Sequence, residues 1–177
     1  MSKIRFTEPN REILARRDSI INDLTRLVDP AGLITSTDEC RAYETDALTA
    51  YRKMPLAVVL PKTTEEVSAV LKYCHDTGVK VVPRGAGTSL AGGAIPSEDA
   101  VVLGLSKMNR VLAVNYDDRF IRVEAGVTNL SVTAVVAENG FFYAPDPSSQ
   151  LACTIGGNIA NNSGGAHCLK YGVTTNN

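Results

Sequence analysis

Apolar residues recur at helical spacing in three segments of the chain. Residues 9–28 carry arginines and aspartates between seven apolar positions, Ile13, Leu14, Ile20, Ile21, Leu24, Leu27 and Val28. This pattern predicts an amphipathic helix. Residues 63–78 show the same spacing, and Thr63 followed three positions later by Glu66 is typical of a helix start. Gly78 is well placed to end that helix, and a third helix is expected over 128–140.

Short apolar runs bounded by turn residues predict five strands, at 56–60, 79–83, 100–105, 111–116 and 119–126. The stretch between the first helix and the first strand has no regular pattern, and residues 145–165 are expected to form a turn-rich block. This order lacks the regular alternation of a doubly wound sheet. The fold class expected is therefore mixed α+β.

Composition narrows the range of partners. The 177 residues carry a formal net charge of −1 and contain no basic run, so no nucleic-acid partner is expected. No segment approaches the ~18 consecutive apolar residues of a membrane span. The N-terminal residues 1–19 are charged throughout, so no signal peptide is predicted and a cytoplasmic location is expected. The four cysteines are scattered and only two histidines are present, so no metal site is expected.

The first glycine-rich segment, PRGAGTSLAGG at 83–93, follows a predicted strand. It does not match a nucleotide triphosphatase loop, because Gly93 stands where lysine is required. It does not match the dinucleotide fingerprint either, since Leu90 occupies the third glycine position and Pro96 leads toward a strand, not a helix. Two interpretations remain. The segment is a loop whose peptide N–H groups converge on a phosphate, or it is an ordinary surface loop.

A second glycine-rich segment, TIGGNIANNSGG at 154–165, again places glycine pairs among small polar residues. Two backbone-rich segments with little charge suit a large ligand that has a phosphate section and a flat polar ring, as FAD has. Two unrelated loops are the alternative.

The pairing of PRGAGTSLAGG with PDPSSQLACTIGGNIANNSGGAHCLKYG resembles the FAD-linked oxidases of the vanillyl-alcohol oxidase type, and in particular their glycolate oxidase and D-lactate dehydrogenase branch. The likeness runs from about Thr35 to the last residue and includes YETDALTAYRKMPLAVVLPKTTEEV at 43–67. It implies an α+β FAD-binding domain with mixed small sheets flanked by helices, incomplete at the C-terminus. The division expected is a helical extension and lead-in over 1–50 and the FAD-binding domain over 51–177.

The resemblance also implies which residues contact FAD. The first segment would wrap the pyrophosphate and the second would lie along the ribityl chain and the isoalloxazine ring, which gives Arg84, Gly85, Ala86, Gly87, Thr88, Ser89, Gly92, Gly93, Pro147, Ser148, Thr154, Gly156, Gly157, Asn158, Asn161 and Gly164. Arg84 is equally open to a role as a structural clip. Several relatives bond the flavin through a histidine at the position of Thr88. A threonine lacks that imidazole, so noncovalent FAD is expected.

The activity implied is oxidation of a small 2-hydroxy acid, glycolate or D-lactate, by hydride transfer to flavin. Partner subunits with iron–sulfur centres and peripheral association with the inner membrane through them are also implied. The alternatives are a sugar or aromatic-alcohol oxidase of the same superfamily and a non-catalytic FAD-binding subunit. His167 is either a base or a polar residue satisfied by nearby backbone, and the catalytic residues stay unknown. Relatives continue into a substrate-capping domain, so no turnover is expected from 177 residues alone.

Overall fold

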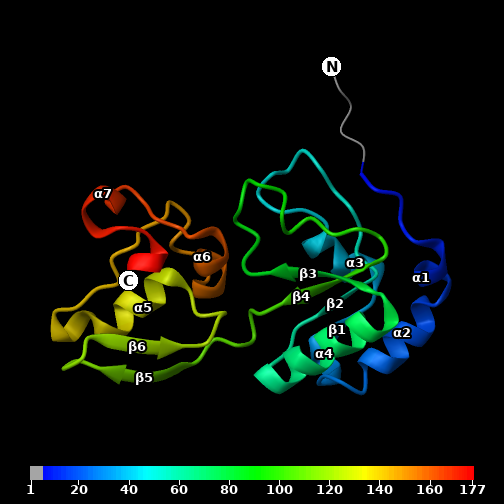
Figure 1. Cartoon of the computed structure of the whole chain (residues 1–177), viewed down its shortest axis with the longest axis horizontal. Coiled ribbons are helices and arrows are strands. Elements are labelled where there is room, and N and C mark those ends of the chain that lie inside the picture. Colours follow the sequence, from blue (N-terminus) through cyan, green and yellow to red (C-terminus); the bar gives the residue numbers. More distant parts are fainter. Residues whose placement is uncertain (1–5) are drawn as a thin grey trace.

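The computed structural model describes residues 6–177. Residues 1–5, part of the segment in which no signal peptide was predicted, lie outside the described residues. The chain forms two lobes that lie side by side (Figure 1). The first lobe contains a four-stranded sheet and the second a two-stranded sheet. No helix among the described residues has the length and apolar character needed to cross a membrane.

The first lobe is built on the sheet order β1-β2-β4-β3, in which β1 is antiparallel and the other strands are parallel. Its elements are α1 (Arg11–Ala15), α2 (Arg17–Leu24), β1 (Leu33–Ile34), α3 (Thr37–Cys40), β2 (Ala57–Val59), α4 (Thr64–Thr77), β3 (Lys80–Arg84) and β4 (Ala100–Gly104). Parallel neighbours need a long crossover between them. Helix α4 is the crossover between β2 and β3, and the glycine-rich segment is the crossover between β3 and β4.

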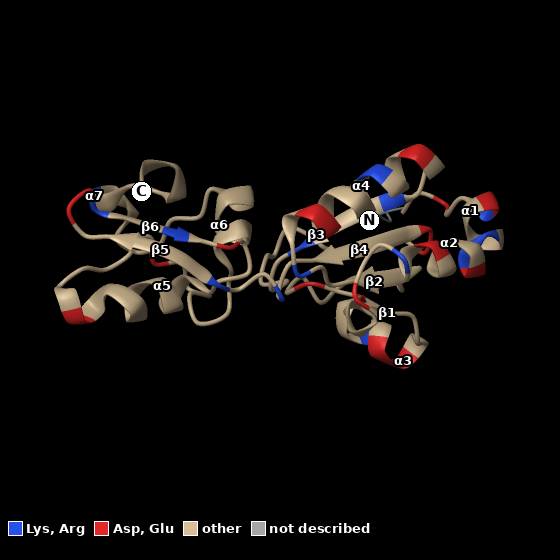
Figure 2. Cartoon of the chain, turned by 90° about the horizontal axis from the view of Figure 1, so that it is seen from below, with Lys and Arg blue, Asp and Glu red and all other residues tan. Residues whose placement is uncertain are grey.

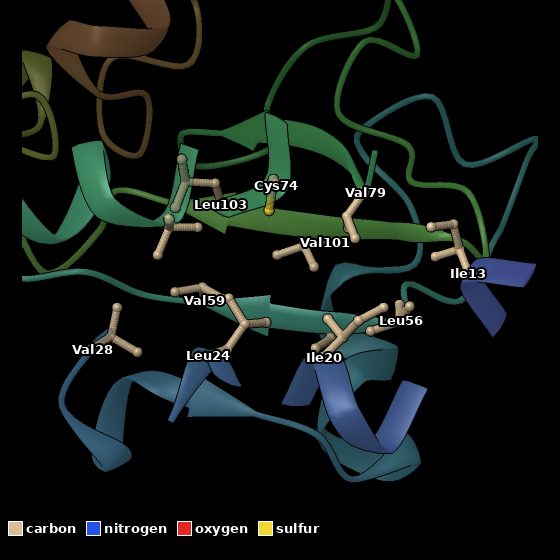
Figure 3. Close-up of a cluster of buried hydrophobic side chains, with 12 residues drawn as sticks. Ile13, Ile20, Leu24, Val28, Leu56, Val59, Cys74, Val79, Val101 and Leu103 are labelled. Carbon is tan, nitrogen blue, oxygen red and sulfur yellow. The ribbon is translucent and has the colours of Figure 1, made fainter. Parts of the chain in front are cut away.

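The larger core lies between this sheet and the helices α1, α2 and α4 (Figure 3). Alternate residues of the central strands face opposite sides: Val59 and Val101 belong to this core, whereas Val58 and Val102 pack with Cys40 of α3 on the other face. Strands buried on both faces read as continuous apolar runs. That is why the sequence predicted β2 and β4 correctly.

The N-terminal helices share this core with the strands that follow. Ile20 and Leu24 are fully buried against β2 and β4, and β1 pairs with β2. The single helix expected over 9–28 is wrong in two respects: Arg16 is not helical and separates α1 from α2, and α2 ends at Leu24. The division at residue 50 stays a prediction, and the core crosses that position without a break.

The second lobe pairs β5 (Val111–Asn115) with β6 (Phe120–Val123) in an antiparallel hairpin. Three helices complete it, α5 (Asn129–Val136), α6 (Ile155–Asn161) and α7 (Cys168–Tyr171). Charged positions are concentrated on the helices of the first lobe, and much of the second lobe is uncharged (Figure 2).

Local sequence signals placed α4 accurately. Thr63 Oγ1 accepts the N–H of Glu66 at 3.2 Å, and Gly78 ends the helix in the left-handed conformation. The turn-rich block expected over 145–165 also contains a helix, α6, which the sequence pattern did not predict. Glycine and asparagine are poor helix formers, so α6 depends on contacts that the sequence pattern does not show.

Candidate functional site

The two glycine-rich segments meet in the structure. Gly85 directly follows β3, at the carboxyl end of the parallel strands, and faces the first turn of α6. A Cβ atom at Gly85 would lie 2.6 Å from Thr154 Oγ1 and 3.7 Å from Gly157 N. Only glycine allows so close an approach. We call this contact of Gly85 with Thr154 and Gly157 the seam.

The start of α6 is held by its own chain. Thr154 is buried, and its Oγ1 accepts the N–H of Gly157 at 3.2 Å. The N–H groups of Ile155 and Gly156 donate to the carbonyls of Val127 and Ala125, each at 2.8 Å. These N–H groups are therefore already satisfied. An anion at the seam needs donors from elsewhere.

The first segment supplies such donors. Within the described residues, no group accepts a hydrogen bond from the backbone N–H groups of residues 85–90. Gly87 has a φ of +71°, which turns the peptide groups on either side of it. Residues 85–93 and α6 contain no charged side chain. Unpaired peptide N–H groups in a glycine-rich turn are suited to phosphate oxygens.

Arg84 acts as a clip between this segment and residues 43–48, which we call the support segment. Its Nη1 donates to the carbonyl of Thr45 at 2.7 Å, and its guanidinium lies 5.5 Å from the centre of the Tyr43 ring. A Cβ at Gly87 would overlap the guanidinium. Burial lowers the pKa of Arg84, an effect opposed by Tyr43 and Asp46. Of the two roles open to Arg84, the structure supports the structural one.

The support segment also binds the glycine-rich segment directly. Ala47 donates its N–H to the carbonyl of Gly87 at 2.9 Å, and Leu48 lies beside Gly92. Sequence reasoning did not assign residues 43–48 to the site. Their only signal was the likeness of YETDALTAYRK to the start of the flavin domain in the related oxidases.

Asn158 is a second feature of the site that points to a ligand. The residue is 1% exposed, and its Nδ2 has no hydrogen-bond partner in residues 6–177. A buried amide N–H without a partner costs free energy. An acceptor atom of a bound molecule in contact with this amide would remove that cost.

The structure does not bring all the expected contacts together. Gly164 packs against the side chains of Cys168 and Val173. Asn161 donates its Nδ2 to the carbonyl of Gly157 within α6. Pro147 and Ser149 accept backbone N–H groups within the turn that leads to Cys153, and Ser148 is exposed.

His167 lies next to these residues and is paired with a carboxylate. Its Nδ1 is 2.6 Å from Asp146 Oδ2, and its backbone N–H donates to Oδ1 of the same side chain. The interpretation that nearby backbone satisfies this ring is wrong, because its partner is a side chain. The hydrogen bond from His167 lowers the pKa of Asp146.

These features fit FAD. Unpaired N–H groups at 85–90 suit a pyrophosphate, the absence of a Cβ at Gly85 lets the two glycine-rich segments touch at the seam, and the buried amide of Asn158 lacks an acceptor. The donors are neutral, which suits a cofactor whose charge is confined to its phosphates.

Solved structures share the fold. A structure of alkyldihydroxyacetonephosphate synthase superposes with a TM-score of 0.79 over 96% of this chain and 33% of that chain, at 22% identity. A structure of p-cresol methylhydroxylase superposes with a TM-score of 0.72 over 88% of this chain and 30% of that chain, at 20% identity. The fold is therefore an α+β fold of the vanillyl-alcohol oxidase type, as the sequence predicted.

Curated relatives are more similar in sequence. The glycolate oxidase subunit GlcD of Escherichia coli K12 is 48% identical over 161 residues, which are 91% of this chain and 32% of the relative. A D-lactate dehydrogenase of Archaeoglobus fulgidus is 38% identical over 159 residues, 89% of this chain and 35% of the relative. The chain thus spans about a third of the length of these relatives. A family model described as an FAD binding domain matches residues 55–177, and the chain belongs to that family.

Proposed function

We propose that this chain forms the FAD-binding part of a flavin-dependent oxidoreductase that oxidises a small 2-hydroxy acid. The observation that carries the proposal is the seam: Gly85, the first residue of a stretch whose N–H groups at 85–90 are unpaired, lies against Thr154 and Gly157 in the first turn of α6. The similarity to the glycolate oxidase subunit and to D-lactate dehydrogenases favours glycolate or D-lactate as substrate.

Different residues of the chain have different roles in binding FAD. The peptide N–H groups of 85–90 hold the pyrophosphate, with the hydroxyl groups of Thr88 and Ser89 beside them. Arg84 keeps that segment on its support, and Thr154 fixes the turn of α6 that faces it. When bound, FAD supplies a two-electron oxidant that accepts a hydride from the α-carbon of the acid. Because Thr88 has no imidazole, the cofactor is held without a covalent bond.

The sixteen residues expected to contact FAD stay a proposal as a set. The assignment has its strongest support at Gly85, Thr154 and Gly157, which meet at the seam. The assignment has its weakest support at Gly164, which packs against Cys168 and Val173. The division into a lead-in over 1–50 and an FAD-binding domain over 51–177 also stays a proposal.

The relatives' names also favour an assembly. One is called a glycolate oxidase subunit, so we propose that this chain works with partner subunits. We further propose that these partners carry iron–sulfur centres and hold a cytoplasmic enzyme peripherally at the inner membrane. Co-purification of brown, iron-containing subunits with the tagged protein is the expected result. A purified protein without such partners contradicts this part of the proposal.

FAD binding by residues 1–177 is the first test. Titration of FAD with the chain should quench flavin fluorescence to a defined endpoint. A second preparation that carries Gly85→Ala, which places a Cβ against Thr154, should bind more weakly. No quenching by the unchanged chain contradicts the proposal.

The substrate class is tested with the full-length protein. Anaerobic addition of glycolate or D-lactate should bleach the oxidised flavin absorbance. Bleaching by a sugar or an aromatic alcohol instead identifies the alternative oxidase. A bound flavin that no substrate bleaches identifies a non-catalytic FAD-binding subunit.

A further inference from the structure

Two buried side-chain polar atoms of the described residues have no hydrogen-bond partner: Nδ2 of Asn158 and Oδ2 of Asp46. Asn158 belongs to the α6 side of the site already described. Asp46 lies in the support segment and has been given no role. Its side chain belongs to a residue that is only 4% exposed. A buried carboxylate oxygen without a partner is costly, so it needs another source of compensation.

Asp46 is enclosed by contacts to the first glycine-rich segment. On one side of it, the Thr45 carbonyl accepts Nη1 of Arg84 at 2.7 Å. On the other side, Ala47 donates its N–H to the carbonyl of Gly87 at 2.9 Å. Its own Oδ1 accepts the N–H of Leu48 at 2.9 Å, which fixes the carboxylate in a tight turn. The carboxylate is therefore fixed between two contacts to the first glycine-rich segment.

Arg84 is the cation next to this carboxylate. Its guanidinium has five N–H donors, and one of them is used, by the Thr45 carbonyl. The same hydrogen bond places the guanidinium next to the residue that precedes Asp46. No ion pair joins Arg84 to Asp46 among the residues that the structure describes, yet the charge of Asp46 counters the effect of burial on the Arg84 pKa. Opposite charges that are buried or half-buried compensate each other more strongly than exposed charges do.

We propose that Asp46 is a positioning residue for the cofactor, whose negative charge holds the Arg84 guanidinium beneath Gly87. The guanidinium in turn keeps residues 85–90 in the conformation that presents their N–H groups to the pyrophosphate. Asp46 acts through Arg84, because its own free oxygen is buried. The cofactor part of this inference rests on the proposed function, whereas the coupling of Asp46 to Arg84 does not.

The coupling is tested without flavin. Asp46→Asn keeps the shape of the side chain and the oxygen that accepts the Leu48 N–H, and removes only the charge. Arg84→Met removes the opposite charge and leaves Asp46 uncompensated. We expect each single variant to lower the folding equilibrium constant measured in urea. The folding equilibrium constant of the double variant should fall by about tenfold less than the product of the factors by which the two single variants lower it. If the factor for the double variant equals the product of the two single factors, the side chains are not coupled and the proposal is overturned.

FAD affinity provides the second measurement. Asp46→Asn should raise the dissociation constant for FAD about tenfold, since residues 85–90 lose their fixed conformation, and adding Arg84→Met should raise it little further. Asp38→Asn is the matched control, because Asp38 is an exposed aspartate of α3. Unchanged FAD affinity in Asp46→Asn, with loss of stability only in Asp46→Ala, would show that Asp46 merely accepts the Leu48 N–H. If the unchanged chain does not bind FAD, the proposed function fails while the urea measurement still decides the coupling.

Discussion

Nδ1 of His167 lies 2.6 Å from Oδ2 of Asp146, and the backbone N–H of His167 donates to Oδ1 of the same carboxylate. This pair joins the segment that precedes α7 to the turn that leads toward α6. Asp146 lies against Gly165 at the end of the second glycine-rich segment, so the pair fixes the end of that segment.

Asp146→Asn should lower the stability of the protein at pH 7. The hydrogen bond from His167 holds the pKa of Asp146 below its usual range. A carboxylate with a lowered pKa stabilises the fold above its ordinary pKa, and that stabilisation is lost as the pH falls through the lowered value. The difference in melting temperature between the two proteins should therefore shrink toward zero in acid. Asp117→Asn, at an exposed aspartate of the β5–β6 turn, is the control. A difference that persists unchanged in acid contradicts the ionic role.

Gly85→Ala should destabilise the protein and weaken FAD binding. The new Cβ would lie 2.6 Å from Thr154 Oγ1, which caps α6 through the N–H of Gly157. Loss of an N-cap costs about 1 kcal/mol. Urea unfolding measures the change, and Gly93→Ala is the control for stability because a Cβ there meets open space. Equal stabilities of the two variants would contradict the prediction, because they would mean that Thr154 accommodates the new Cβ without loss of stability.

Asp99→Asn should reduce stability by about 2 kcal/mol at pH 7, since charge-assisted hydrogen bonds contribute that much. The Asp99 side chain is fully buried and accepts hydrogen bonds from the backbone N–H of Asn10 and from Ser97, and it pairs with Lys80 at 2.8 Å. Burial alone would raise its pKa, but the hydrogen bonds from Lys80 and Ser97 outweigh burial and lower the pKa to about 2.

The lowered pKa of Asp99 sets the pH range of its effect. Its contribution is complete above the ordinary carboxyl pKa of 3.8 and is lost as the pH falls from there toward about 2. Urea unfolding of both proteins over this range should show the difference disappearing. Glu98→Gln, at a half-exposed residue paired with Lys53, should change stability far less at every pH.

Bound flavin should leave the protein completely on denaturation. The resemblance to the FAD-linked oxidases implies that Thr88 stands where several of them carry a flavin-linking histidine, and a hydroxyl group does not replace the imidazole. Acid precipitation should leave all the flavin absorbance in the supernatant. A fluorescent protein band on a denaturing gel would contradict noncovalent binding.

Sequence alone determined the elements whose signals are local. The run 100–105 predicted β4 because a strand buried on both faces is apolar at every position. Thr63, Glu66 and Gly78 marked both ends of α4, since caps act on groups a few residues away. The two glycine-rich segments and their likeness to one superfamily also identified the family and the fold before any coordinates.

Tertiary structure alone decided how the site is assembled. Helix α6 forms in a segment rich in glycine and asparagine because Val127 and Ala125 bind its first N–H groups. The clip from Arg84 to the Thr45 carbonyl joins residues 39 positions apart. The unpartnered oxygen of Asp46 becomes apparent only when the surrounding chain buries it. No periodicity or cap encodes such contacts, because they depend on which surfaces the folded sheet brings together.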